Sequence, residues 1–165
     1  MADAQLQATV AEFLFCEARL LDAQNWRRWL ELYAEDCLFW APATTMWGGY
    51  TADPERELNF IYIVGRAGLE ARVFRLETNS SMASTPPPRT CHLVTCVIID
   101  EANPEQVCAT AHWQTVSFSE QTGQRIRSGS YEYVLHREGG SFRIARKKIF
   151  LLEHVIDGFF DFYMI

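Results

Sequence analysis

Four long runs of apolar and aromatic residues fill the second half of the chain, and they constrain its fold most strongly. These runs cover residues 91–100, 106–119, 125–137 and 142–152. The segments between them are short and rich in turn residues, as in Asn103-Pro104 and Gly139-Gly140. Long strands joined by short turns pair as antiparallel hairpins. The second half is therefore predicted to form a largely antiparallel sheet.

The first half begins with a helical pattern. Apolar residues recur at spacings of three and four from Gln5 to Leu21, which predicts an amphipathic helix, and Asp3 is placed to cap it. A second helix is expected from about Asn25. Its apolar face would carry Trp26, Trp29, Leu30 and Tyr33.

Shorter elements are expected between these helices and the long strands. Residues 37–41 and 58–64 are apolar runs of strand length, and residues 66–77 return to helical spacing. Loops are predicted at 43–56 and 78–88. Helices followed by strands are typical of an α+β fold, with the helices on one face of a curved sheet. Five aromatic side chains of the strands cannot all point inward: Trp113, Phe118, Tyr131, Tyr133 and Phe150.

Length and composition exclude several classes of protein. A chain of 165 residues is expected to form one domain, residues 1–165, and 48% hydrophobic residues exclude a disordered chain. The net charge is −6 and the longest basic run, Arg146–Lys148, is short, which argues against nucleic acid as a partner. The sequence has no apolar stretch of about 20 residues, so no membrane-spanning helix is expected. The first residues do not resemble a signal peptide, so we expect a cytoplasmic protein.

The cysteines and histidines do not form a metal-binding pattern. Five cysteines at irregular spacing are expected to be reduced and mostly buried. Cys91, His92 and Cys96 lie close in sequence, but alternation along a strand places Cys91 opposite both His92 and Cys96. Along a strand, Cys91 and Cys96 would be separated by about 16 Å. The four histidines show no metal-ligand spacing. We therefore predict no metal or cofactor site in this chain.

General acid–base catalysis is the chemistry that the sequence leaves open. A cone-shaped α+β fold can enclose an apolar pocket in which a carboxylate of raised pKa and a histidine transfer protons. Asp36 with His92 or His112 would serve this role if the side chains face such a pocket. The alternative is that they are ordinary hydrogen-bonded strand residues.

Aromatic residues are unusually frequent in segments that would otherwise be polar. Trp47 and Tyr50 lie in a predicted loop, and residues 159–165 are, apart from Asp161, apolar to the last residue. Aromatic and apolar surface patches mark interfaces. The aromatic tail either docks on a partner or covers the chain's own sheet.

A set of short motifs extends over almost the whole chain. They are Glu12–Asp22, Trp26–Asp36, Phe39–Pro42, Thr51–Pro54, Gly65–Leu76, Ser84–Thr90 with the following His92-Leu-Val, Arg146–Lys148, Val155–Asp157 and Asp161–Tyr163. Their order and spacing resemble the small (β) subunits of bacterial aromatic-ring-hydroxylating dioxygenases. The resemblance is closest to the benzoate, toluate and anthranilate group.

This resemblance implies a fold for the chain and separate roles for the small and large subunits. The fold would be the cystatin-like cone of nuclear transport factor 2, scytalone dehydratase and ketosteroid isomerase, with helices on a strongly curved mixed sheet. The small subunit would carry no redox centre and would form a homotrimer within an α3β3 hexamer. The large (α) subunit would hold a Rieske [2Fe–2S] cluster and a mononuclear Fe(II), and a reductase would supply electrons from NADH.

The same resemblance suggests a reaction. The complex would add both atoms of dioxygen to an aromatic ring to give a cis-dihydrodiol. Benzoate is the leading substrate, with anthranilate, toluates, halobenzoates and related sulfonated or bicyclic aromatics left open. This chain would support assembly of the large subunits rather than carry catalytic residues.

Subunit interfaces are anchored by aromatic and arginine side chains. We select for contacts to sister or large subunits Trp47, Tyr50, Arg72, Arg75, Arg89, Phe159, Phe160 and Tyr163. Internal packing is the alternative, for example ion pairs of Arg72 and Arg75 with Glu70 or other carboxylates within the chain. Two other functions remain open: a free-standing cone-fold isomerase or dehydratase using Asp36 with His92 or His112, and a ligand-binding module with a wide apolar pocket and no trimer.

Overall fold

A computed structural model describes residues 4–80 and 86–165 of the chain. Within these residues the chain forms three α-helices and one six-stranded sheet with the strand order β2-β1-β6-β5-β4-β3. The helices are α1 (Ala4–Asp22), α2 (Trp26–Leu30) and α3 (Arg66–Glu77). The strands are β1 (Tyr33–Pro42), β2 (Asn59–Val64), β3 (Arg89–Ala102), β4 (Gln106–Ser119), β5 (Gly123–Glu138) and β6 (Ser141–Leu151).

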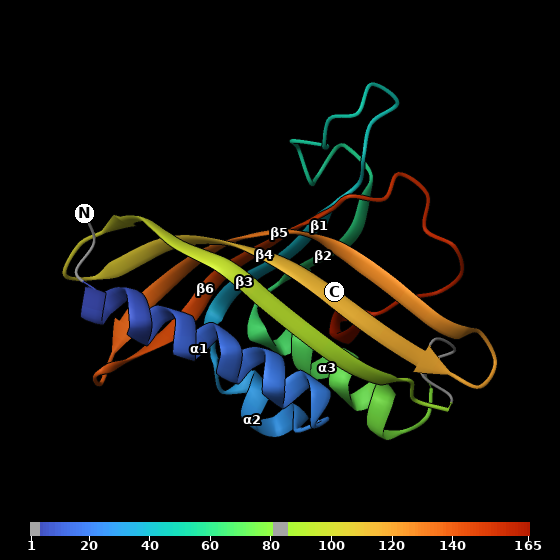
Figure 1. The fold of residues 1–165 in the computed structure, drawn as a ribbon, viewed down its shortest axis with the longest axis horizontal. Coiled ribbons are helices and arrows are strands. Elements are labelled where there is room, and N and C mark those ends of the chain that lie inside the picture. Colours follow the sequence, from blue (N-terminus) through green and yellow to red (C-terminus); the bar gives the residue numbers. More distant parts are fainter. Residues whose placement is uncertain (1–3, 81–85) are drawn as a thin grey trace.

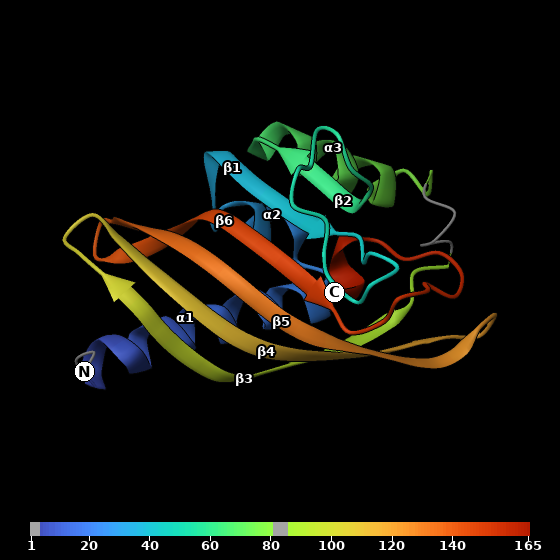
Figure 2. The same ribbon diagram turned by 90° about the horizontal axis from the view of Figure 1, so that it is seen from above.

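The sheet is mixed because one pair of strands is parallel. Strands β3 to β6 follow one another as antiparallel neighbours, as the long runs and short turns predict. Strand β1 then pairs parallel to β6 and antiparallel to β2. All three helices lie on the same side of the curved sheet in Figure 1, and Figure 2 looks onto the opposite side. The expected α+β arrangement is confirmed.

Helix α1 packs along the concave side of the sheet. Its buried residues include Val10, Leu14, Ala18 and Leu21, which recur at helical spacing and face β3 and the core. Its predicted cap, Asp3, lies outside the described residues, as do residues 81–85 of the predicted loop 78–88. Helix α3 covers β1 and β2 with Leu69 and Val73. The apolar stripes of both helices therefore form one core with the sheet.

The second helix is shorter than the sequence predicts. It ends at Leu30, and Tyr33 begins β1 instead of continuing the helical face. Asn25 caps the helix, since its side chain accepts a hydrogen bond from the backbone N–H of Arg28. Tyr33 is buried and its hydroxyl bonds to Glu17 of α1. This long-range contact outweighs the local helical spacing, and the predicted strand 37–41 extends to 33–42.

The C-terminal segment returns to the chain's own core. After β6, residues 152–161 follow an irregular path to a short 3-10 helix, η2 (Phe162–Met164). The residues from Phe162 to Ile165 are buried, and Phe162 stacks on Trp29 with ring centroids 4.8 Å apart. For these four residues, the alternative that the tail covers the chain itself is therefore the correct one.

Two expectations about side-chain burial have different outcomes. Of the five strand aromatics, Trp113, Tyr131 and Tyr133 point inward, whereas Phe118 is exposed and Phe150 half-buried. The expectation of mostly buried cysteines is wrong. Of the five cysteines, all in described segments, Cys37 is buried, Cys108 intermediate, and Cys16, Cys91 and Cys96 are exposed. Three of them stand on outward-facing positions of α1 and β3, where an apolar pattern carries no information about burial. Strict alternation also fails in β3, because Cys96 has a φ of 51° where the register of the strand shifts.

Candidate functional site

The residues selected for acid–base chemistry do not come together. Asp36 is exposed on β1. His92 and His112 lie on opposite faces of the sheet, since His92 pairs with the buried Thr115 while His112 is exposed opposite Thr95. The geometry therefore does not support a free-standing isomerase or dehydratase built on these three residues.

His92 instead pairs with a residue that sequence reasoning did not select. Its Nδ1 lies 2.6 Å from a carboxylate oxygen of Asp22 at the end of α1. The backbone N–H of His92 donates to the other oxygen at 2.9 Å, and the hydroxyl of Thr90 donates to the first at 2.9 Å. Burial would raise the pKa of Asp22, but these hydrogen bonds and the nearby imidazole lower it below 3.8. The cluster fastens the C-terminus of α1 to β3. Nε2 of His92 is buried and has no hydrogen-bond partner among the residues that the structure describes.

A second polar cluster lies deep between α1 and the sheet. The Glu17 carboxylate accepts hydrogen bonds from Tyr33 at 2.6 Å, Tyr133 at 2.8 Å and the Lys147 ammonium at 2.9 Å. Glu17 and Lys147 are 2% and 1% exposed, so the ion pair is withdrawn from water. Burial would raise the pKa of Glu17, but Lys147 and the three hydrogen bonds hold it below its usual range. Burial lowers the pKa of Lys147 despite the opposing effect of Glu17.

Aromatic rings complete the surroundings of the Lys147 ammonium. The nitrogen lies 4.3 Å from the centroid of the Tyr131 ring, 5.6 Å from Tyr133 and 5.8 Å from Phe39. Cation–π attraction at such distances stabilises a desolvated ammonium. The cluster fills the interior between helix and sheet, and it holds α1 through contacts with β1, β5 and β6. Side chains alternate along β6, so Lys147 shares the inner face with Ile149 and Leu151. The sequence pattern could therefore have predicted that the Lys147 side chain is buried.

Four of the residues selected for interfaces bond within the chain. Tyr50 is half-buried, with its hydroxyl on the carbonyl of Leu151 at 2.8 Å. Arg72 forms an ion pair with the carboxylate of Asp161 at 3.5 Å, so for this residue the alternative of a pair within the chain is confirmed. The Phe160 ring lies 5.4 Å from the Arg127 guanidinium, and Tyr163 is 1% exposed. These four side chains hold the loop and the tail in place.

The other four selected residues are exposed. Trp47 is 92% exposed at the tip of the loop between β1 and β2, and Phe159 is 71% exposed in the C-terminal segment. Arg75 is exposed on α3, and Arg89 is exposed on β3 with its guanidinium 5.3 Å from the Phe118 ring. These residues are the part of the selected set that is available to a partner.

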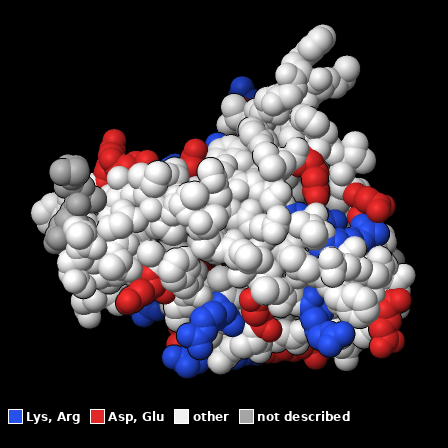
Figure 3. All heavy atoms as spheres, viewed as in Figure 1, with Lys and Arg blue, Asp and Glu red and all other residues white. Residues whose placement is uncertain are grey.

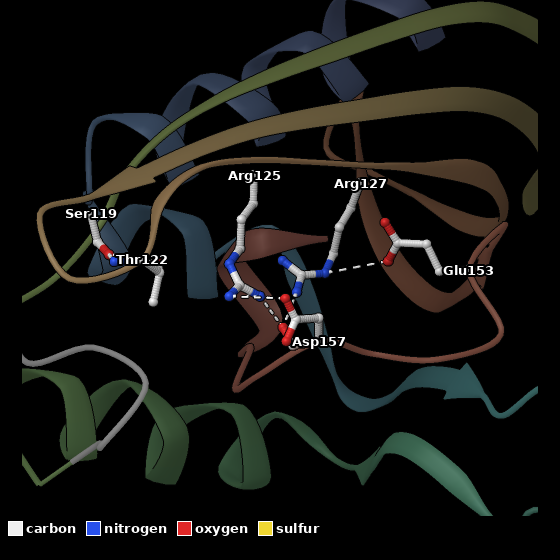
Figure 4. A network of polar contacts seen from close by, with 6 residues as sticks. All are labelled: Ser119, Thr122, Arg125, Arg127, Glu153 and Asp157. Atoms are coloured by element: carbon white, nitrogen blue, oxygen red, sulfur yellow. Dashed lines mark hydrogen bonds and ion pairs between the residues drawn. The ribbon is translucent and has the colours of Figure 1, made fainter.

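Two arginines of β5 hold the segment that carries Phe159 (Figure 4). Arg125 and Arg127 both donate to the backbone carbonyl of Asp157, and Arg125 also pairs with the Asp157 carboxylate at 3.2 Å. Arg127 reaches Glu153 at 3.5 Å. Burial lowers the pKa of Arg127, and Glu153 partly opposes this effect. The arginines thus fix residues 153–158, and Phe159 follows directly on the outside.

The described residues offer no grouping typical of a metal site or a membrane span. Within residues 4–80 and 86–165, no three His, Cys, Asp or Glu side chains gather closely enough to hold a metal ion. No described helix has the length and apolar character needed to cross a membrane.

Comparison with known proteins identifies the family. Residues 16–158 match the family described as ring hydroxylating beta subunit. The chain belongs to this family. It is 34% identical over 156 residues to the benzoate 1,2-dioxygenase β subunit of Acinetobacter baylyi, covering 94% of this chain and 92% of that protein. It is 36% identical over 156 residues to the 2-halobenzoate 1,2-dioxygenase small subunit of Burkholderia cepacia, covering 94% of both.

Solved structures confirm the fold. The crystal structure of the benzoate 1,2-dioxygenase β subunit of Burkholderia mallei superposes with a TM-score of 0.77 at 31% identity, over 100% of this chain and 99% of that one. A putative scytalone dehydratase of Novosphingobium aromaticivorans superposes with a TM-score of 0.68 at 16% identity. The superposition covers 92% of this chain and 88% of that one. The second similarity concerns the fold alone, and it confirms the predicted cone. This chain is a small subunit of an aromatic-ring-hydroxylating dioxygenase.

Proposed function

We propose that this small subunit serves a dioxygenase that acts on a benzoate-type aromatic carboxylate, and that its role is to hold catalytic large subunits in one assembly. The observation that carries the proposal is the end-to-end match to small subunits of benzoate and 2-halobenzoate dioxygenases at 34% and 36% identity.

The arrangement of the side chains supports a structural role. The acid–base candidates are dispersed, and the buried carboxylate of Glu17 and the half-buried carboxylate of Asp22 already accept hydrogen bonds from the chain itself. By contrast, the side chains of Trp47 and Phe159 are exposed, although the loop that carries Trp47 is fixed by a hydrogen bond and the C-terminal segment that carries Phe159 by an ion pair. Fixed and exposed aromatic side chains are typical anchors of a subunit interface.

The proposed assembly follows the family resemblance. Three copies of this chain would support three large subunits, which would hold the Rieske [2Fe–2S] cluster and the mononuclear Fe(II). Electrons would come from NADH through a reductase. The cofactors would supply the oxidation of the ring, and this chain would bind and orient the subunits that carry them. Assembly of this kind would take place in the cytoplasm.

Co-purification tests this function directly. The tagged chain would be recovered from its own host grown on benzoate, and the complex examined by mass spectrometry and visible absorption. We expect a coloured complex with a large chain that carries Cys-x-His and Cys-x-x-His motifs. Recovery of a colourless chain alone, from cells in which the pathway is active, would contradict the proposal.

A substrate panel then separates the carboxylates. The purified complex, with its reductase and NADH, would be given benzoate, 2-chlorobenzoate, anthranilate and a toluate, and oxygen uptake compared with diol formation. We expect benzoate to give the highest kcat/KM with uptake matched by product. A higher value for another acid would assign that substrate instead.

A further inference from the structure

The loop between β1 and β2 rises from the side of the sheet opposite to the helices (Figure 1). Its tip is a small ordered hairpin, since Thr44 bridges to Tyr50 and the backbone N–H of Thr45 donates to Gly49 at 2.7 Å. Gly48, with a φ of 80°, allows the tight turn. Met46 and Trp47 stand at the apex, 95% and 92% exposed. An apolar apex is therefore held in one conformation without any contact that buries it.

The base of the loop is tied to the end of β6. The Tyr50 hydroxyl donates to the carbonyl of Leu151 at 2.8 Å, and the Thr44 hydroxyl to that of His154 at 3.4 Å. The Tyr50 ring also packs on Phe150 with centroids 4.8 Å apart. The apex thus stands on a rigid base, which lowers the entropy that binding would cost.

A hollow of about 520 Å³ lies on the outer face of β3, β4 and β5. It is lined by small residues of β5, among them Gly129, and by larger side chains that include Leu93, His112 and Leu152. A side chain cannot be added at Gly129, because its Cβ would meet the carbonyl oxygen of Phe150. Leu93 and Leu152 are exposed at the rim. The hollow is apolar and lies on the same side of the sheet as the loop.

Charge indicates which partner fits these two features. Residues 43–51 contain no Asp, Glu, Lys or Arg, and neither do the described residues that line the hollow. Figure 3 shows the tip of the loop free of charged side chains. Copies of a chain with net charge −6 repel one another and can approach most closely through uncharged surfaces. A protrusion and a hollow on one chain are also complementary between copies, and such a head-to-tail contact can close into a ring.

We propose that Met46 and Trp47 of one copy insert into the hollow beside Leu93 and Leu152 of the next copy. This inference rests on the proposed function, in which several small subunits lie side by side. It assigns a protrusion and a receptor site on the same chain, so the two can be disabled separately.

Complementation between variants of the full-length chain tests the contact. Sedimentation velocity would compare the wild type, Trp47→Ala and Leu93→Glu, with Phe74→Ala as a control for an exposed aromatic on α3. We expect the wild type and Phe74→Ala to associate, and each interface variant alone to sediment as a monomer. An equimolar mixture of Trp47→Ala and Leu93→Glu should form dimers, because one copy keeps the hollow and the other keeps the protrusion. A monomeric wild type, unimpaired association of Trp47→Ala, or a mixture without dimers would overturn the proposal.

Photo-crosslinking in the purified complex with the large subunit separates this proposal from the proposed function. A benzophenone amino acid would replace Trp47. We expect a product of two small subunits, joined at peptides that contain residues 93–95, 112–114, 128–130 or 152. Crosslinks to the large subunit would overturn the present inference, yet they would support the role as an assembly subunit. Recovery of the wild-type small subunit without any large subunit would count against the proposed function instead.

Discussion

The two sides of the sheet differ in how their side chains are satisfied. On the helix side, the Glu17–Lys147 pair and the Asp22–His92 pair meet partners within the chain. On the opposite side, Trp47 and Leu152 are apolar and exposed. Breaking a buried ion pair leaves a charge without water or partner, whereas truncating an exposed side chain removes few contacts. The helix side therefore determines stability, and the opposite side is available for association.

The buried pair should give the largest effect. Lys147→Met leaves the Glu17 carboxylate buried without its cation, and we expect a loss of about 3–5 kcal/mol in the free energy of unfolding. Urea unfolding of the purified chain measures it. The double variant Glu17→Leu/Lys147→Met removes both charges and should recover part of the loss. A single-variant loss below about 1 kcal/mol would show that the pair does not hold α1 to the sheet.

The Asp22 cluster should give a smaller effect with a distinct pH dependence. Because the pKa of Asp22 is lowered in the folded chain, its contribution is present above the ordinary value of 3.8 and is lost as pH falls through the lower folded value. Asp22→Asn should cost about 1–3 kcal/mol at pH 7 and reduce the loss of stability on acidification. Unfolding free energies from pH 7 down to about pH 2 test this, since the two curves should converge below 3.8. Parallel curves for variant and wild type would contradict it.

An exposed ion pair provides the contrast with the buried one. Arg27 and Glu77 lie 2.6 Å apart, but the Arg27 side chain is 71% exposed. We expect Arg27→Met to cost about 0.2–1 kcal/mol, since water and salt screen such pairs. Urea unfolding at low and high salt measures the cost and should show it shrinking with salt. A loss of unfolding free energy near that of Lys147→Met would show that the exposed and the buried ion pair contribute equally to stability.

The projecting loop should give the smallest effect on stability. Trp47→Ala removes a side chain with few contacts, so we expect the unfolding free energy to change by less than about 0.5 kcal/mol. Thermal unfolding at a protein concentration low enough to keep the chain monomeric measures it. A larger loss would indicate that the tryptophan serves the fold of its own chain rather than association.

Local patterns predicted most of the fold because they report which face of an element is buried. The predicted helix 66–77 and strand 106–119 agree with the structure residue for residue. Tyr33 was placed on a helix because its spacing fits one. Its actual place depends on Glu17, sixteen positions earlier in the chain. Periodicity cannot express a contact between side chains of different elements.

The polar clusters were harder to predict for the same reason. Asp22 and His92 are 70 positions apart and meet only because α1 crosses β3. Lys147 belongs to a short basic run, but alternation with Ile149 places its side chain on the inner face of β6. Trp47 and Phe159 are exposed, and their place in an interface stays a prediction. Burial of Tyr163 depends on the path of the tail, which the sequence pattern left open.

Native mass spectrometry of the complex recovered through the tagged chain tests the central claim most directly. The account predicts one species that contains three copies of this chain and three copies of a large subunit that carries iron. A chain that is recovered without a large subunit, from cells that hydroxylate an aromatic carboxylate, would contradict it.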